Sequence, residues 1–242
     1  MPDRLPMRFD VVTLFPPLFA PFLSQGVTRR AFAEGGPLQV VVHDLRDHAH
    51  GAYRRVDDRP FGGGPGMVLM AEPLAACVRA VRTQRAAAGV DADGASVPVV
   101  LFSPHGRRID HACAQSWACR GGAILICGRY EGVDQRFIDR YVDEQLSAGD
   151  LVLSGGELPA LMLLDAVARL LPGVLGDAGS APQDSFHPQV QGLLDCPHYT
   201  RPEVWEGQCV PDVLLSGHHE RIESWRQDQR LDHTRRLRPD LL

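Results

Sequence analysis

Two stretches decide the fold of this chain: Cys127-Gly128-Arg129-Tyr130-Glu131-Gly132-Val133-Asp134, and Ser147-Ala148-Gly149-Asp150-Leu151-Val152-Leu153-Ser154-Gly155-Gly156-Glu157-Leu158-Pro159. Each contains a short apolar run, residues 123–127 and 151–153, that leads into glycines and a carboxylate. A strand that ends at glycine lets the backbone approach a ligand closely, because no Cβ stands in the way. Ligands of open α/β sheets bind where strands deliver such loops at their carboxyl ends. We therefore expect the two loops to form two walls of one pocket.

Strands and helices alternate along the sequence around these loops. β-branched and apolar runs predict strands, amphipathic stretches with capping residues predict helices, and residues 44–66 predict a long polar loop. The expected strands are 8–14, 38–43, 97–102, 123–127 and 151–153, and the expected helices are a short one after Phe15, then 27–34, 71–89, 110–120 and 157–171. Alternation of this kind favours an α/β fold with a parallel sheet.

The chain changes character near residue 176. Residues 176–183 (GDAGSAPQ) have the small, polar composition of a linker. Beyond them, aromatic residues stand among prolines, and residues 218–231 predict a helix rich in arginine. We predict a first domain over 1–175, a linker over 176–183, and a small helical domain over 184–242.

Overall composition places the chain among ordinary globular proteins. It has 242 residues, 44% hydrophobic and 23% charged, with no apolar run of membrane-spanning length and no signal-like N-terminus, so we expect a cytoplasmic protein. Six cysteines without CxxC spacing predict reduced thiols rather than disulfides or a metal site. The net charge is −5 and all 25 basic residues are arginine, which favours local rather than general contact with nucleic acid.

Several familiar sites are disfavoured by spacing. Residues 62–66 (GGGPG) lack the Lys-Ser or Lys-Thr of a phosphate-binding loop, and Ser154 does not lie in a GxSxG elbow. His43, His48 and His50 lack acid–histidine spacing, so we expect solvated loop histidines. Asp184 is compatible with a simple helix cap as well as a functional role. Arg169 alone is compatible with a solvated helix face.

Taken together, many ordered segments resemble the bacterial tRNA (guanine-N1)-methyltransferases of the knotted SPOUT superfamily. The resemblance runs nearly end to end. The segments that carry it are 14–16, 56–60, 62–67, 103–104, 128–132, 149–150, 153–159, 172–176, 184–186 and 193–202. It implies a homodimer with a deep trefoil knot that binds S-adenosylmethionine and methylates N1 of the guanosine directly 3′ of the tRNA anticodon (position 37). It also implies dependence on Mg²⁺, with ligands that the sequence leaves unassigned.

The resemblance assigns site residues by position. Asp184 matches the family's general base, because N1 of guanine carries a proton that must be accepted. Arg169 matches an arginine that would stabilise charge at O6. The expected cofactor pocket consists of Leu101, Phe102, Ser103, Pro104, Gly128, Tyr130, Glu131, Ala148, Gly149, Asp150, Leu151, Val152, Leu153, Gly155, Gly156 and Pro159. The expected tRNA-binding residues are Asp57, Arg59, Gly66, Arg221, Arg226 and Arg230.

Three positions depart from the family pattern. The family has glutamine at the position of His105, isoleucine at that of Ala148 and tyrosine at that of Leu151. These positions supply mainly backbone and apolar wall, so we expect cofactor binding to be retained. Two other functions stay open: methylation of a ribose 2′-oxygen from the same pocket, and an RNA-binding module without chemistry. Intact glycines together with Asp184 and Arg169 favour the guanine-N1 enzyme over both.

Overall fold

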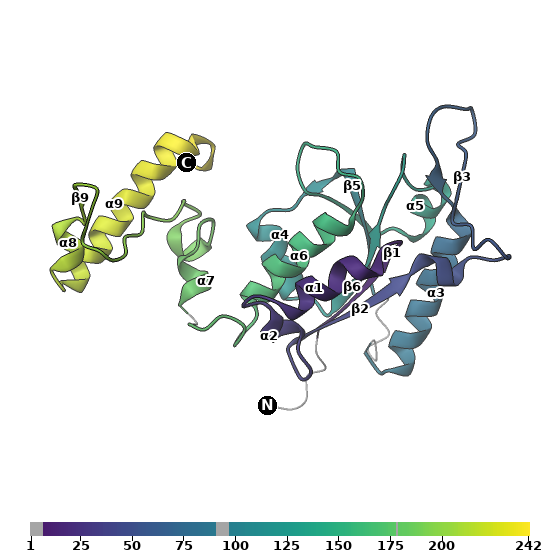
Figure 1. The fold of residues 1–242 in the computed structure, drawn as a ribbon, viewed down its shortest axis with the longest axis horizontal. Coiled ribbons are helices and arrows are strands. Elements are labelled where there is room, and N and C mark those ends of the chain that lie inside the picture. Colours follow the sequence, from purple (N-terminus) through teal and green to yellow (C-terminus); the bar gives the residue numbers. More distant parts are fainter. Residues whose placement is uncertain (1–6, 91–96, 178) are drawn as a thin grey trace. The chain divides into compact units, whose positions relative to one another are not determined.

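The computed structural model describes residues 7–90, 97–177 and 179–242 (Figure 1). The chain divides into two compact units, Met1–Leu175 and Gly176–Leu242. Residues 1–6 of the predicted first domain and residue 178 of the predicted linker lie outside the described ranges.

A five-stranded sheet forms the centre of the first unit. Its strands are β1 (Met7–Thr13), β2 (Leu38–Asp44), β5 (Val99–Arg108), β6 (Gly122–Cys127) and β7 (Glu144–Ser147), arranged in the order β2-β1-β6-β5-β7. All four pairings are parallel. β6 is buried along its whole length, as expected for a strand covered on both faces. The predicted α/β fold with a parallel sheet is confirmed.

Helices cover both faces of this sheet (Figure 1). Because side chains alternate along a strand, Phe9 and Val11 pack with α4 (His111–Ala118) and α6 (Glu157–Leu170), whereas Val12 packs with α3 (Ala71–Ala87) and with Phe137 of α5 (Gln135–Tyr141). The smaller elements of the unit are η1 (Pro16–Leu18), α1 (Phe19–Ser24), α2 (Arg29–Phe32), η2 (Leu45–His48), β3 (Asp57–Asp58) and β4 (Val68–Leu69).

The prediction of a strand over residues 151–153 is wrong. Leu151 and Val152 are exposed, with 52% and 86% of their surface accessible, and they lie in the loop that follows β7. β7 itself has the sequence EQLS, which lacks an apolar run, because it is an edge strand that pairs on one side with β5. Helix α5 was also not predicted. With seven residues, this helix is too short to show a clear helical period of apolar residues.

A buried ion cluster ties α3 to the sheet. Asp10 of β1 is fully buried and accepts hydrogen bonds from Arg8 (2.7 Å), from Arg85 of α3 (2.8 Å) and from His43 of β2 (2.8 Å). Burial alone would raise the pKa of Asp10, but these hydrogen bonds outweigh it and hold the pKa below its usual value. The expectation that His43 is a solvated loop residue is therefore wrong, because His43 lies in β2 and its side chain, 9% exposed, binds Asp10.

The second unit contains little apolar core. Its elements are α7 (Ser180–Gln183), η3 (Pro188–Val190), β8 (Val204–Trp205), β9 (Gln208–Cys209), α8 (Asp212–Leu215), α9 (His219–Leu237) and η4 (Pro239–Leu241). The helix predicted over 218–231 is present but continues to Leu237, because no glycine or proline stops it earlier. The buried apolar residues of the second unit include Val190, Leu193 and Cys196.

All six cysteines are free thiols, as the sequence predicts. Over the described ranges, no helix has the length and apolarity needed to span a membrane.

Candidate functional site

The loops that follow β6 and β7 line one cavity of about 420 Å³ in the first unit. The bulged part of β5 adds a third wall, which contains Leu101, Phe102, Ser103 and Pro104. The carboxyl ends of β6 and β7 and the bulge of β5 thus meet at a single site, and ligands of open α/β sheets bind at such strand ends. The expectation of one pocket between two glycine-ended loops agrees with this geometry, although β7 rather than residues 151–153 delivers the second loop.

Backbone contacts hold the β6 and β7 loops together. The amide of Gly156 donates to the carbonyl of Gly128 at 2.9 Å, and Arg129 and Gly155 form an isolated antiparallel bridge. A Cβ on Gly156 would lie 2.7 Å from the Cα of Cys127, closer than real Cβ contacts allow. Glycine at 156 is therefore required by this close approach of two backbones.

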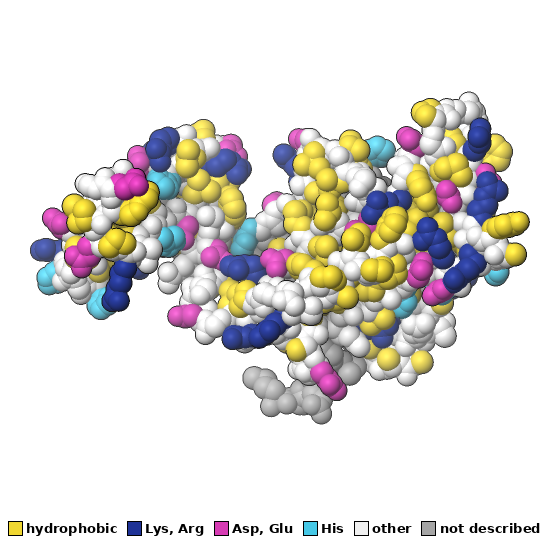
Figure 2. Space-filling view, in the orientation of Figure 1, with side chains coloured by type: hydrophobic (Ala, Val, Ile, Leu, Met, Phe, Trp, Pro, Cys, Tyr) yellow, Lys and Arg dark blue, Asp and Glu magenta, His cyan; other side chains and the backbone are white. Residues whose placement is uncertain are grey.

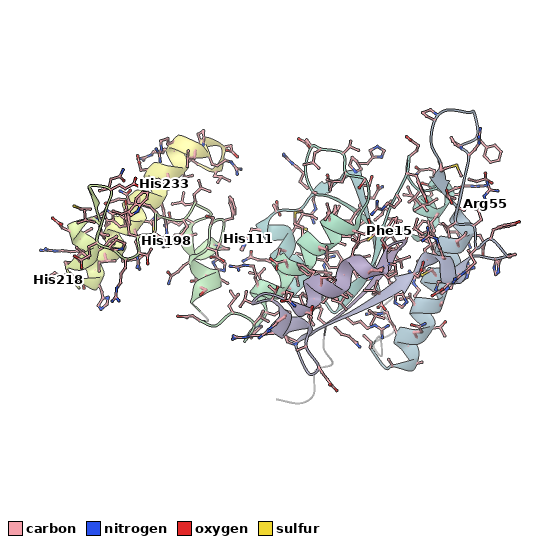
Figure 3. The ribbon with its side chains drawn as sticks, in the orientation of Figure 1. Phe15, Arg55, His111, His198, His218 and His233 are labelled. Atoms are coloured by element: carbon pink, nitrogen blue, oxygen red, sulfur yellow. The ribbon has the colours of Figure 1, made fainter. Side chains whose placement is uncertain are left out.

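An ion pair reinforces the same junction. Arg129 donates from Nε to Glu157 at 2.9 Å and from its terminal nitrogen to the carbonyl of Ser154 at 3.1 Å. The Glu157 carboxylate is 1% exposed and also accepts from Thr13 Oγ1 at 2.7 Å. The guanidinium stacks 4.4 Å from the ring centre of Phe15, which Figure 3 labels. The pair therefore links the ends of β1, β6 and the start of α6.

A buried thiol lies beside this ion pair. Burial, and next the negative charge of Glu157, raise the pKa of the Cys127 thiol well above its usual value. Cys127 is therefore a neutral thiol at physiological pH and is not an activated nucleophile.

β5 bulges where it pairs with β7. Pairing between the two strands shifts register between Phe102 and Arg107, so residues 103–106 bulge out of the sheet. The amide of His105 donates to Ser103 Oγ at 3.1 Å, which closes the bulge. His105 is exposed and lines the cavity, so the departure from the family pattern at this position lies on the cavity wall.

Most of the residues expected to bind the cofactor surround this cavity. Gly149 and Asp150 do not line it, and the side chain of Asp150 is 89% exposed, 3.7 Å from Arg108. The expected residues that do line it are Leu101, Phe102, Ser103, Pro104, Gly128, Tyr130, Glu131, Ala148, Leu151, Val152, Leu153, Gly155, Gly156 and Pro159.

Further lining residues escaped the sequence reasoning. Arg129 stands inside the glycine-bounded stretch but carries no separate signal for a lining role. Val133, Gln135 and Ile138 also face the cavity, and the last two belong to α5, which the sequence pattern did not predict. A prediction of helix α5 from the sequence would have placed Gln135 and Ile138 at the cavity.

The loop expected to contact substrate docks on the β6 loop. The amide of Glu131 donates to the carbonyl of Met67 at 3.0 Å, and a Cβ on Gly66 would lie 2.5 Å from Glu131 Cγ. Asp57 pairs with Leu69 in the β3–β4 ladder, and Arg59 lines a second cavity of about 1230 Å³. The structure therefore brings the expected substrate loop next to the expected cofactor loop.

The two candidate catalytic residues belong to different units. Arg169 lies in the last turn of α6, in the first unit. Asp184 directly follows α7, in the second unit. Of the arginines on α9, Arg221 is exposed and Arg226 is partly exposed, 3.6 Å from Glu223. Arg230 differs, because its side chain is 4% exposed and is paired with Glu223 at 2.9 Å. Its burial leaves little side-chain surface for an RNA phosphate.

Among the described residues, one group of three has metal-ligand chemistry: Asp195, Cys196 and His198, with ligand atoms within 4.8 Å of one another. Mg²⁺ prefers oxygen ligands, so this mixed set does not fit it. The Asp195 carboxylate already accepts from His198 at 2.9 Å and lies 3.6 Å from Arg230. Burial opposes the effect, but hydrogen bonds from His198 and Cys196 hold the pKa of Asp195 below its usual value.

Comparison with known proteins gives one consistent result. The family model described as "tRNA (Guanine-1)-methyltransferase TrmD" matches residues 7–242. Similar proteins named tRNA (guanine-N(1)-)-methyltransferase include the following three. That of Paracidovorax citrulli is 65% identical, over 98% of this chain and 91% of the relative. That of Albidiferax ferrireducens is 64% identical, over 98% and 92%. That of Bordetella pertussis is 58% identical, over 98% and 90%.

Proposed function

This chain belongs to the tRNA (guanine-1)-methyltransferase family, and from that premise we propose that it methylates N1 of the guanosine directly 3′ of the tRNA anticodon, with S-adenosylmethionine as the methyl donor. The single observation that carries the proposal is the cavity formed by the bulge of β5 and by the glycine-containing loops after β6 and β7. Family membership supports methyl transfer, and the cavity supports a place for the donor.

The cavity suits the donor in size and in chemistry. A volume of about 420 Å³ lies in the range of small-molecule sites. Leu101, Ile138 and Leu153 offer apolar surface for an adenine ring, and Ser103 and Glu131 offer polar groups for the ribose and the amino acid. When bound, S-adenosylmethionine supplies a methyl group on a positively charged sulfur.

Residues of this chain would accept the proton that leaves N1 and stabilise the charge that develops on the base. During methyl transfer to N1, the Asp184 carboxylate would accept the N1 proton. Arg169 would stabilise the charge that builds on O6 as the proton leaves. The target base must first leave its stack in the anticodon loop, which costs a few kcal/mol.

A homodimer with the trefoil knot is part of the proposal. Figure 2 shows hydrophobic side chains gathered on the face of the first unit where α1 and α6 lie. Phe15, Leu18, Leu158 and Met162 on or beside these elements are 39–60% exposed. Exposed apolar clusters of this kind commonly mark protein interfaces. In such a dimer Asp184 would act on a cofactor held mainly by the other subunit. The backbone bridge between Arg129 and Gly155 supports the close chain crossing that a knot requires.

The second unit would bind the tRNA. Exposed Arg221 and partly exposed Arg226 on α9 suit phosphate contacts, which position RNA without reading its bases. We propose that Asp57, Arg59 and Gly66 contribute from the first unit. Arg230 is not among the proposed contacts, because its side chain is buried. The Mg²⁺ requirement and the cytoplasmic location stay predictions.

Transfer of labelled methyl to two tRNA transcripts tests the proposal. One transcript carries guanosine 3′ of the anticodon, and the other differs only by adenosine at that position. We expect label in the first transcript alone, and loss of that label in Asp184→Asn protein that still binds S-adenosylmethionine in a calorimeter. The variant keeps the size of the side chain but removes the proton acceptor.

Each other outcome removes part of the proposal. Label in both transcripts would keep the donor pocket but overturn the target base. Label in neither, with magnesium present and donor binding measured, would favour an RNA-binding protein without chemistry. Full single-turnover rate in Asp184→Asn would remove the general-base role alone.

A further inference from the structure

Helix α9 packs Trp225 against Tyr199 and also buries two polar residues. Its two buried residues are Arg230, 3% exposed, and Thr234, 0% exposed. A surface helix normally docks through an apolar stripe, because apolar burial drives packing. Burying an arginine and a threonine is costly unless their polar atoms find partners. The partners they find therefore indicate what this helix is built to hold.

The partners that lie outside α9 belong to one short segment, residues 193–195. The amide of Leu194 donates to Thr234 Oγ1 at 3.0 Å, and this hydroxyl donates to the carbonyl of Arg230 at 2.7 Å. Arg230 Nε lies 3.6 Å from the Asp195 carboxylate, an ion-pair distance, while its terminal nitrogen binds Glu223 at 2.9 Å. One side of the 193–195 segment is thus fixed to α9.

The other side of the same segment holds the turn that begins at Asp184. The amide of Phe186 donates to the carbonyl of Leu193 at 2.9 Å, and the amide of Asp195 donates to Ser185 Oγ at 2.8 Å. Phe186 adopts a left-handed backbone, with φ of 72°, although it has a side chain. Such a conformation persists only where surrounding contacts impose it. The two hydrogen bonds to residues 193–195 are such contacts.

We infer that Arg230 and Thr234 are positioning residues, which act through residues 193–195 to hold the Asp184 turn in the geometry needed for proton transfer. The inference rests on the proposed role of Asp184 as general base. It gives Arg230 a role inside the protein in place of an RNA contact. A general base works only within hydrogen-bond reach of its proton, so a loosened turn slows chemistry even when every substrate binds.

Hydrogen exchange measures the positioning directly, without reference to activity. Thr234→Val keeps the shape of the side chain but removes the acceptor for the Leu194 amide. We expect the backbone amides of residues 185–195 to exchange roughly three- to tenfold faster, the loss expected for one hydrogen bond of ordinary strength. Thr234→Ser, which restores the hydroxyl, should restore protection. Amides of β6 in the first unit serve as the internal reference.

Methyl transfer supplies the functional readout. In Thr234→Val and in Arg230→Lys, which keeps the charge but loses the planar fork, single-turnover methyl transfer at saturating tRNA should slow by about tenfold. The Kd for S-adenosylmethionine, set by the first unit, should not move. Arg221→Gln on the exposed part of the same helix is the matched contrast. It should weaken tRNA binding without changing exchange in residues 185–195.

The outcomes separate this inference from the proposed function. Unchanged exchange in residues 185–195 in both Thr234→Val and Arg230→Lys would overturn the inference, whatever the activity. Weaker tRNA binding with a reduced salt dependence in Arg230→Lys, at an unchanged single-turnover rate, would overturn it by making Arg230 a phosphate contact. Faster exchange in Thr234→Val and Arg230→Lys would support the positioning. If Asp184→Asn then kept full single-turnover activity, the general-base role would be removed. If Thr234→Val fails to fold, Arg230→Lys decides alone.

Discussion

Gly156→Ala tests whether the close approach of the β6 and β7 loops shapes the cofactor site. An added Cβ would lie 2.7 Å from Cys127 Cα and 3.0 Å from the Gly128 amide nitrogen. Both neighbours are backbone atoms, so no flexible side chain can move aside. Overpacking of this kind typically costs about 1–3 kcal/mol. The loops must separate to relieve it, which would stretch the 2.9 Å hydrogen bond from Gly156 to Gly128.

This strain should appear in two measurements. If it is relieved by widening the cavity, the Kd for S-adenosylmethionine rises by roughly 5- to 150-fold, since about 1.4 kcal/mol corresponds to a factor of ten. If the fold absorbs it, the melting temperature falls by about 2–4 °C for each kcal/mol. Calorimetric titration gives the first quantity, and thermal unfolding followed by circular dichroism gives the second.

Gly121→Ala is the matched control for this experiment. A Cβ at Gly121 has no heavy atom within 4 Å among its described neighbours, so the same substitution should change neither quantity. An unchanged melting temperature in Gly156→Ala, with a Kd within roughly twofold of the wild type, would refute the reasoning. It would mean that the loops are free to separate and that their contact does not shape the site.

Three further substitutions test other parts of the structure. Glu157→Gln keeps the shape but removes the charge that Arg129 binds, so urea unfolding should show a loss of about 1.5–3 kcal/mol; an unchanged midpoint would contradict this. Asp10→Asn leaves two buried arginines without a carboxylate and should lose about 3–5 kcal/mol at pH 7. Because the folded pKa of Asp10 lies below its usual value of 3.8, the wild type keeps this contribution above that pH and loses it as the pH falls further; the variant should lack that part of the acid dependence. Arg221→Gln should reduce the slope of log affinity for tRNA against log salt by about 1, without affecting donor binding; an unchanged slope would exclude a phosphate contact.

Local sequence signals predicted the parts of the fold that local chemistry controls. β1, β2 and β6 are runs of β-branched and apolar residues, and α3 and α6 show helical periodicity with buried apolar faces. The glycines that let backbones approach a ligand are visible without coordinates. These signals depend on residues close together in the chain, so a pattern detects them.

Long-range pairing decided the rest. Edge strand β7 forms because β5 offers it a parallel partner, although EQLS has no strand signal of its own. The apolar run 151–153 stays outside the sheet for the opposite reason, since β7 already occupies that edge. Helix α5, which brings Gln135 and Ile138 to the cavity, depends on packing of Phe137 into the core.

The sequence by itself determined the α/β order, the family and the identity of most cavity residues, because glycine positions and ordered segments are properties of the chain. Only the tertiary structure decided which of the arginines are exposed and which are buried. Arg221 and Arg230 lie on one helix and look alike in sequence, yet the first is exposed and the second is buried against Glu223 and Asp195. That difference depends on which helix face the rest of the unit covers. Hydrophobic periodicity in the sequence does not reveal that face where the buried residues are polar.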